Sequence, residues 1–159
     1  MSEKLISMIE LPARVKKLRA GGKTIVATNG CFDLLHAGHV RYLKRARALG
    51  DVLVVGLNGN ASVHELKGEG RPLNDEKDRA EVLAALDSVD LVTIFPELRA
   101  TRFLLAAAPD IYVKGGDYNS DTLNAEERAA LERVGTKIDI VPFEKGYSTT
   151  RMIEKLRGT

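Results

Sequence analysis

Five short apolar segments recur along the chain and are rich in valine and isoleucine. They lie at residues 25–29, 51–58, 90–95, 110–115 and 137–143. Their near-continuous apolar character is typical of strands in a parallel sheet that is covered on both faces. We therefore expect five buried parallel strands.

Helical patterns alternate with these segments. They lie at residues 8–20, 38–49, 75–87, 99–107 and 125–134, and a last one at 149–156. Asn124 followed by Glu127 resembles a capping box that opens the helix at 125–134. The alternation predicts a single α/β domain over residues 1–159. It is expected to be a Rossmann-like open sheet of about five parallel strands with helices on both faces.

Glycine and polar residues follow several of the predicted strands. They are Asn29–Gly30, Asn58–Gly59 and Gly115–Asp117. Ligands of open α/β sheets bind beyond the carboxyl ends of the strands, so we expect the site there. The least regular stretch is 58–74, which we interpret as a long glycine-containing loop. Such loops in compact domains are often functional.

The composition is that of a soluble globular protein, with 44% hydrophobic and 29% charged residues. The formal net charge is only +2, so the overall balance predicts neither a nucleic acid nor a membrane partner. The basic run at 41–47 is interpreted as a solvated helix face. Cys31 is the only cysteine, which excludes an internal disulfide and fits a reducing compartment. No apolar run approaches the roughly 18 residues of a membrane span and no leader is apparent, so we expect a cytoplasmic protein.

Two of the three histidines lie in 28-TNGCFDLLHAGHV-40, where a strand is predicted to run into a helix. His36 and His39 are three residues apart and would share one helix face. Gly38 removes a side chain and would let a ligand approach the backbone. Imidazole donors beside a helix N-terminus suit a phosphate that gains charge during a reaction. Packed or solvent-facing histidines are the structural alternative, and a zinc site lacks further ligands at suggestive spacing, since only His64 is left.

The chain lacks two familiar phosphate signatures, G-x-G-x-x-G after the first strand and G-x-x-x-x-G-K-[ST]. The histidine motif instead resembles the signature of the HxGH nucleotidyltransferase superfamily. Within it, the chain is most similar to the heptose 1-phosphate adenylyltransferases of lipopolysaccharide core synthesis. The similarity rests on NGCFDLLHAGHVRYL, VVGLNGNASV, LKGEGRPLNDEKDRAEVL, YVKGGDY and GYSTTRMI. Such domains are often fused to a sugar kinase, and we expect no kinase domain in a chain of 159 residues.

The resemblance implies transfer of AMP from ATP to D-glycero-D-manno-heptose 1-phosphate, which yields ADP-heptose and pyrophosphate. The attacking sugar phosphate oxygen is already an anion, so no general base is needed. This agrees with the lack of a convincing carboxylate pair or Ser/His/Asp set in the sequence. The expected cofactor is Mg²⁺, held mainly by ATP phosphates and water rather than by protein ligands. The family also suggests a homodimer.

The resemblance further assigns residues to roles. The catalytic candidates are His36, His39 and Lys67, and the nucleotide-binding candidates are these three with Asn29, Gly30, Cys31, Phe32, Gly115, Gly116, Asp117, Ser148, Thr149 and Thr150. The substrate-binding candidates are Asp33, Arg71 and Arg79. Asp33 would orient the neighbours of the incoming phosphate or help to hold a metal.

Plain structural roles compete with several of these assignments. Lys67 could be a surface lysine, Gly115–Asp117 a turn, and Ser148 a helix cap that also binds an anion. Cys31 fits a small buried residue in a tight turn, and Phe32 fits the core better than a stacking surface.

The sequence departs from related cytidylyltransferases before the final helix. Residues 143–146 read Phe-Glu-Lys-Gly, where those enzymes carry Arg-Thr-Glu-Gly. This weakens a CTP-dependent assignment and leaves open whether Lys145 or Arg151 supplies the missing positive charge. The alternatives are a cytidylyltransferase for a small phosphorylated alcohol and a nucleotide-binding regulatory module without turnover.

Overall fold

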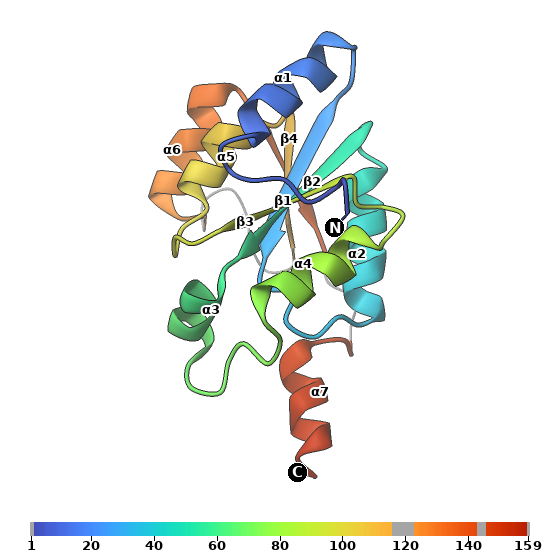
Figure 1. The fold of residues 1–159 in the computed structure, drawn as a ribbon, viewed down its shortest axis with the longest axis vertical. Coiled ribbons are helices and arrows are strands. Elements are labelled where there is room, and N and C mark those ends of the chain that lie inside the picture. Colours follow the sequence, from blue (N-terminus) through green and yellow to red (C-terminus); the bar gives the residue numbers. More distant parts are fainter. Residues whose placement is uncertain (1, 116–122, 143–145, 159) are drawn as a thin grey trace.

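The computed structural model describes residues 2–115, 123–142 and 146–158. Within these residues, five strands form one sheet (Figure 1). They are β1 (Ile25–Gly30), β2 (Val52–Asn58), β3 (Leu91–Phe95), β4 (Ile111–Gly115) and β5 (Lys137–Val141). All pairings are parallel, in the order β3-β2-β1-β4-β5. The predicted strands and their parallel arrangement are confirmed, although β5 ends at Val141 rather than at residue 143.

Seven helices are present in the described part of the chain. They are α1 (Leu11–Ala20), α2 (Ala37–Arg47), α3 (Asn60–Lys67), α4 (Glu76–Ala84), α5 (Thr101–Ala107), α6 (Ala125–Val134) and α7 (Thr149–Leu156). Six of them confirm the predicted helices, with ends that differ by up to three residues. Asn124 caps α6 as predicted, because its side chain accepts from the N–H groups of Glu126 and Glu127.

Helix α3 was missed, because residues 58–74 were expected to form a loop. Its N-cap residue is Gly59, which has no side chain that could cap the helix. Instead the Asn60 N–H donates to the Glu76 carboxylate at 2.8 Å, and the Glu76 N–H donates back to the Asn60 side chain at 2.9 Å. The group that stabilises the start of α3 is therefore sixteen residues away, where a local capping pattern cannot reveal it.

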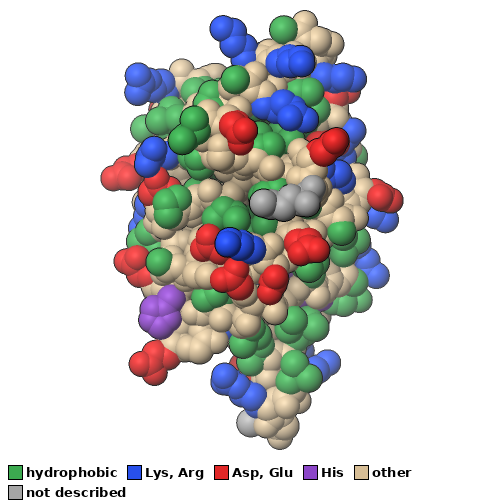
Figure 2. Space-filling model, in the orientation of Figure 1, with side chains coloured by type: hydrophobic (Ala, Val, Ile, Leu, Met, Phe, Trp, Pro, Cys, Tyr) green, Lys and Arg blue, Asp and Glu red, His purple; other side chains and the backbone are tan. Residues whose placement is uncertain are grey.

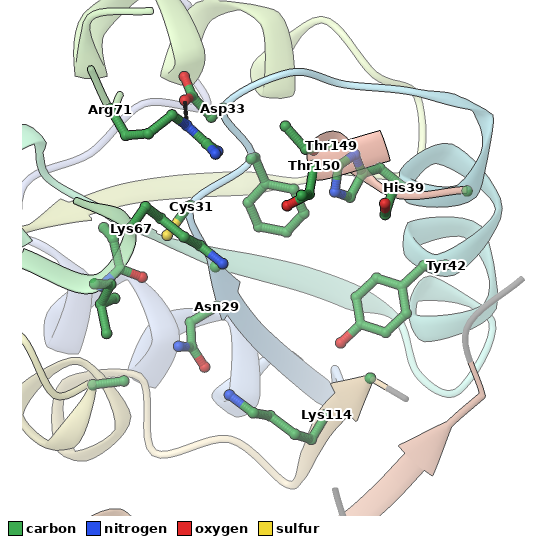
Figure 3. Close-up of a pocket in the computed structure, with 18 of the residues that line it drawn as sticks. Asn29, Cys31, Asp33, His39, Tyr42, Lys67, Arg71, Lys114, Thr149 and Thr150 are labelled. Carbon is green, nitrogen blue, oxygen red and sulfur yellow. Dashed lines mark hydrogen bonds and ion pairs between the residues drawn. The ribbon is translucent and has the colours of Figure 1, made fainter. Parts of the chain in front are cut away.

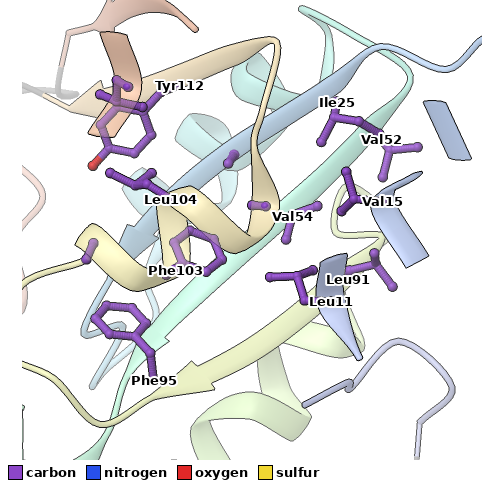
Figure 4. Packing of buried hydrophobic residues seen from close by; sticks show 14 of the residues in the cluster. Leu11, Val15, Ile25, Val52, Val54, Leu91, Phe95, Phe103, Leu104 and Tyr112 are labelled. Carbon is purple, nitrogen blue, oxygen red and sulfur yellow. The ribbon is translucent and has the colours of Figure 1, made fainter. Parts of the chain in front are cut away.

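Helices α1, α5 and α6 cover one face of the sheet. Leu11, Phe103 and Leu131 from these helices belong to the same buried cluster as Ile25 and Val54 (Figure 4). Because successive strand residues point to opposite faces, this cluster takes alternate positions of each strand.

Helices α2 and α4 cover the other face. Leu43 from α2 and Leu83 from α4 join Leu53 and Val55 of β2 in a second buried cluster. Helices on both faces were predicted from the apolar character of the strands, and the two clusters confirm them.

The sheet order makes β1 the point where the chain changes direction. Strand β1 pairs with β2 on one side and with β4 on the other. The loops that leave the carboxyl ends of β1 and β4 therefore diverge and open a crevice between them. No helix among the described residues is long and apolar enough to cross a bilayer.

Candidate active site

A cavity of about 610 Å³ opens at the carboxyl ends of β1, β2 and β4 (Figure 3). It lies at the switch point of the sheet, where ligands of this architecture bind. The starts of α2 and α7 also border it. Two helix N-termini thus supply backbone N–H groups and the positive ends of helix dipoles, which favour an anionic ligand.

Most of the predicted site residues line this cavity. Those that do are Asn29, Gly30, Cys31, Phe32, Asp33, His36, His39, Lys67, Arg71, Gly115, Ser148, Thr149 and Thr150. Gly116, Asp117 and Lys145 lie outside the described residues. Arg79 and Arg151 are described but are not among the lining residues.

His36 and His39 lie side by side at the start of α2. Their ring centroids are 3.9 Å apart and the ring planes differ by 24°. The backbone N–H of His36 points at Nδ1 of His39, at 3.4 Å. Because that N–H can only donate, Nδ1 must present its lone pair, so neutral His39 carries its proton on Nε2. The ring therefore keeps one N–H to offer to a phosphate oxygen.

Both imidazoles are held in the neutral form. Burial, and then the neighbouring His36, lower the pKa of His39 to about 4. Burial also lowers the pKa of His36. Two rings stacked this closely disfavour two positive charges, so at neutral pH each ring carries one N–H donor and no charge.

We expect this shift to make stability depend on pH. The folded-state pKa of His39, about 4, lies below the ordinary histidine value of 6.5, so the unfolded chain binds the proton more readily. The stabilising contribution is present above pH 6.5 and is lost as the pH falls towards 4. The free energy of unfolding should drop by about 2–3 kcal/mol between pH 7 and pH 4.5 from this group.

Urea unfolding of wild type and His39→Gln at pH 7 and pH 4.5 measures that contribution. The wild type should lose more stability than the variant on acidification, by the amount stated. An equal loss in the two proteins would contradict the assignment, since other acid-sensitive groups are shared.

Phe32 and Gly30 shape the turn after β1. Phe32 has a positive φ of 44°, which is strained for a residue with a Cβ. Its ring lies against Gly30, where an added Cβ would be 2.9 Å from the ring. The same ring is 5.4 Å from that of His39 and is only 7% exposed. The prediction of a core role for Phe32 is confirmed, and Gly30 is needed for that packing.

Cys31 lies between these two residues and is partly buried. Burial raises the pKa of its thiol, so the neutral form is favoured. This fits the predicted small residue in a tight turn rather than a nucleophile.

Asp33 ties the segment before α4 to the turn after β1. The carboxylate is 3% exposed and accepts from the Leu73 and Asn74 N–H groups. It also pairs with the Arg71 guanidinium, whose Nε lies 2.8 Å from Oδ2 (Figure 3). These bonds outweigh the effect of burial and lower the pKa of Asp33. Because both carboxylate oxygens are engaged, we assign Asp33 to loop positioning rather than to metal binding.

Arg79 was expected to serve the substrate anions, but it does not line the cavity. It is 2% exposed, and its guanidinium donates to the carbonyls of Asn74, Cys31 and Asn58 and to the side chain of Asn60. The structure thus points to a positioning role, in which one side chain joins the turn after β1, the end of β2 and the start of α3.

The start of α7 combines capping with cavity lining. The Ser148 hydroxyl accepts from the Arg151 N–H at 3.0 Å, which confirms its predicted cap. The Thr149 hydroxyl donates to the Leu34 carbonyl at 3.1 Å and so holds α7 against the turn before α2. Arg151 takes part in this cap through its backbone N–H. Whether Lys145 or Arg151 supplies the positive charge that an arginine provides in related cytidylyltransferases stays open.

Lys114 and Tyr42 were missed as site residues. Lys114 lines the cavity from the end of β4, beside Asn29 (Figure 3). Burial lowers the pKa of its ammonium, and the nearby Glu127 carboxylate opposes that shift. The YVKGGDY segment contains Lys114, so a cation directly before the glycines was the available signal.

Tyr42 lies on α2, lines the cavity and links this helix to two strands of the sheet. Its hydroxyl lies 2.7 Å from the Thr28 hydroxyl and donates to the Val113 carbonyl at 3.1 Å. Burial raises the pKa of Tyr42 to about 12, so it stays a neutral donor. The bonds join α2 to β1 and β4, the strands that flank the crevice.

Helix N-termini and clustered cations favour phosphate groups as ligands. Together with the position of the cavity at the switch point of the sheet, they define an α/β domain of the nucleotide-binding class. Comparison with known proteins narrows that class. The chain belongs to the cytidylyltransferase-like family, whose profile matches residues 27–155.

Curated relatives share much of the sequence. The chain is 49% identical over 154 residues to the bifunctional protein HldE of Geotalea uraniireducens, covering 97% of this chain and 31% of the relative. It is 42% identical over 157 residues to HldE of Wolinella succinogenes, covering 99% and 32%. The chain thus spans about a third of the length of these curated relatives.

Solved structures support the fold. The crystal structure of the lipopolysaccharide core biosynthesis protein from Thermoplasma volcanium is 30% identical with a TM-score of 0.65, covering 80% of this chain and all of that one. The pantoate-beta-alanine ligase of Francisella tularensis is 16% identical with a TM-score of 0.57, covering 98% and 78%, and shows the shared fold alone.

Proposed function

We propose that this domain transfers AMP from ATP to D-glycero-D-manno-heptose 1-phosphate, giving ADP-heptose and pyrophosphate. The observation that carries the proposal is the stacked pair His36 and His39 at the start of α2, with Lys67 on the same cavity. The high identity to HldE proteins and the similarity to a lipopolysaccharide core biosynthesis protein support the choice of acceptor.

The proposed reaction is an in-line displacement. An oxygen of the sugar phosphate forms a bond to the α-phosphorus of ATP, the bond from that phosphorus to the bridging oxygen breaks, and pyrophosphate leaves with the electron pair. His39 donates its Nε2–H to a phosphate oxygen, His36 donates beside it, and Lys67 adds a positive charge. These groups stabilise charge that grows in the transition state. No proton has to be removed from the nucleophile.

Mg²⁺ fits this site as an ion that arrives with the nucleotide. Among the described residues, no group of three His, Cys, Asp or Glu side chains could hold a metal. Asp33 is occupied by Arg71 and by two backbone N–H groups. The ion would therefore be held by phosphate oxygens and water, and it would neutralise the charge of the leaving pyrophosphate.

The two substrates are both anions, and each needs its own positive partner. Lys67 and Arg71 lie on one side of the cavity, and Lys114 lies on another, beyond Asn29 (Figure 3). We assign the triphosphate to the histidines and Lys67, and the phosphate of the sugar to Lys114. The separation of the cations would hold two like-charged groups in line against their repulsion.

Lys114→Met tests this assignment. It keeps the length of the side chain and removes the charge, so KM for the sugar phosphate should rise about 10- to 100-fold, as for loss of one charge-assisted hydrogen bond. The affinity for ATP should change much less. Lys16→Met, at an exposed position of α1, is the matched control and should keep both constants. An increase confined to the KM for ATP would reverse the assignment.

Pyrophosphate release with a panel of nucleotides and sugar phosphates tests the function itself. ATP with heptose 1-phosphate should give robust turnover, and CTP should not. Turnover with CTP and a small phosphorylated alcohol, but not with ATP, would identify a cytidylyltransferase instead. Tight nucleotide binding without turnover on any acceptor would indicate a regulatory module.

A further inference from the structure

Tyr147 lies directly before the cap of α7, against the outer face of His36. The ring centroids are 6.0 Å apart and the planes differ by 20°. The guanidinium of Arg41, one turn along α2, lies 5.2 Å from the centroid of the Tyr147 ring. With His39 and Phe32 on the inner side, these groups form a continuous aromatic column that ends in a cation.

Gly38 makes room for this column. An added Cβ at Gly38 would be 2.7 Å from Cβ of Tyr147 and 2.9 Å from two atoms of the His36 ring. The glycine was interpreted as space for a ligand to reach the backbone. In the structure the same space also lets Tyr147 reach His36, so the glycine of the histidine motif serves the column as well.

His36 differs from His39 in what fixes its ring. Nδ1 of His39 faces the His36 N–H. Nδ1 of His36 is buried and faces the His39 backbone N–H in a capping-box arrangement, but it makes no hydrogen bond of normal geometry among the described residues. Because so weak a contact leaves the ring angle loosely set, the packing on the two faces of the ring has to fix it. One face is covered by His39 and the other by Tyr147.

We propose that Tyr147 is a positioning residue, whose ring holds the His36 imidazole parallel to that of His39 so that both aim at the same phosphate. The role in turnover rests on the proposed nucleotidyl transfer, whereas the effect on the ring itself does not. Arg41 holds Tyr147 from the outside through a cation–π contact. Offset stacking of this kind is directional, so loss of the ring frees the imidazole to rotate.

Tyr147→Ala should lower kcat at least about tenfold and change KM for ATP less, because a misaimed donor affects the transition state more than the bound substrate. Tyr147→Phe keeps the stacking ring and should restore kcat. Leu156→Ala removes a side chain from α7 that is 80% exposed and is the control for a general effect on that helix.

A second readout needs no substrate. NMR titration of the His36 ring protons in the free protein, assigned with His36→Gln, reports its pKa. The titratable and charged groups that face it are His39 on one side and Tyr147, backed by Arg41, on the other. Because burial lowers the pKa of His36, uncovering one face in Tyr147→Ala should raise it towards the ordinary value, and Tyr147→Phe should not.

The two readouts separate the outcomes. An unchanged His36 pKa in Tyr147→Ala, or a Tyr147→Phe variant as impaired as Tyr147→Ala, would overturn the positioning role. If wild type gave no turnover with any acceptor, the proposed function would fail, and the titration would still decide how Tyr147 acts on His36.

Discussion

His39→Ala is expected to reduce pyrophosphate release with ATP and heptose 1-phosphate by about 100- to 1000-fold, with the fold retained. The estimate is that for removing one well-aimed donor from a preorganised anionic site. The loss should appear in kcat more than in KM. The hydrogen bond from the Nε2–H of His39 would strengthen most in the transition state, as charge builds on the phosphate oxygens. Steady-state kinetics with coupled detection of pyrophosphate measures both constants.

His64→Gln is the matched control for this variant. His64 is exposed on α3 and does not line the cavity, and its ring Nδ1 lies 3.3 Å from the Arg71 carbonyl. The glutamine amide can donate to that carbonyl in its place, so the replacement should leave the rate within about twofold. Circular dichroism should show the same folded spectrum for both variants. A His39→Ala enzyme with the wild-type rate would remove the phosphate-binding role of the histidine pair.

Arg79→Met is expected to lower the free energy of unfolding by about 3–5 kcal/mol. The substitution keeps the aliphatic stem but leaves the carbonyls of Asn74, Cys31 and Asn58 without their donor inside the protein. Stranding buried polar groups in this way is among the largest effects of a single substitution. For a domain of this size the melting temperature should fall by roughly 10 °C.

Arg102→Met provides the comparison for Arg79→Met. Arg102 pairs with Glu97 at 2.7 Å, but 75% of its side chain is exposed. Losing such a surface pair should change stability by less than about 1 kcal/mol. Similar melting temperatures for the two variants would show that the buried hydrogen bonds of Arg79 add nothing beyond those of a surface arginine.

The strands and the histidine pair could be predicted because their signals are local. Near-continuous runs such as 51–58 require burial on both faces, whatever their partners are. His36 and His39 share a helix face by spacing alone. Their position at the carboxyl end of β1 follows from the strand–helix order. The resemblance then supplied Lys67, which spacing alone would have left as a surface lysine.

The supporting groups could not be predicted, because their partners are distant in the sequence. Asp33 contacts Leu73 and Asn74, forty and forty-one residues away. Arg79 reaches back forty-eight residues to the Cys31 carbonyl. No periodicity reports such a contact, and a buried arginine on a helix has the same local sequence pattern as a solvated one. Helix α3 was missed for the same reason, since Glu76 stabilises its first turn.

The cavity joins the first strand of the sheet to the last described helix. Strand β1 carries the turn that lines one wall, whereas Ser148, Thr149 and Thr150 line another from the last helix. During synthesis on a ribosome, this cavity therefore stays incomplete until α7 has emerged, because one of its walls is made by residues more than a hundred positions after β1.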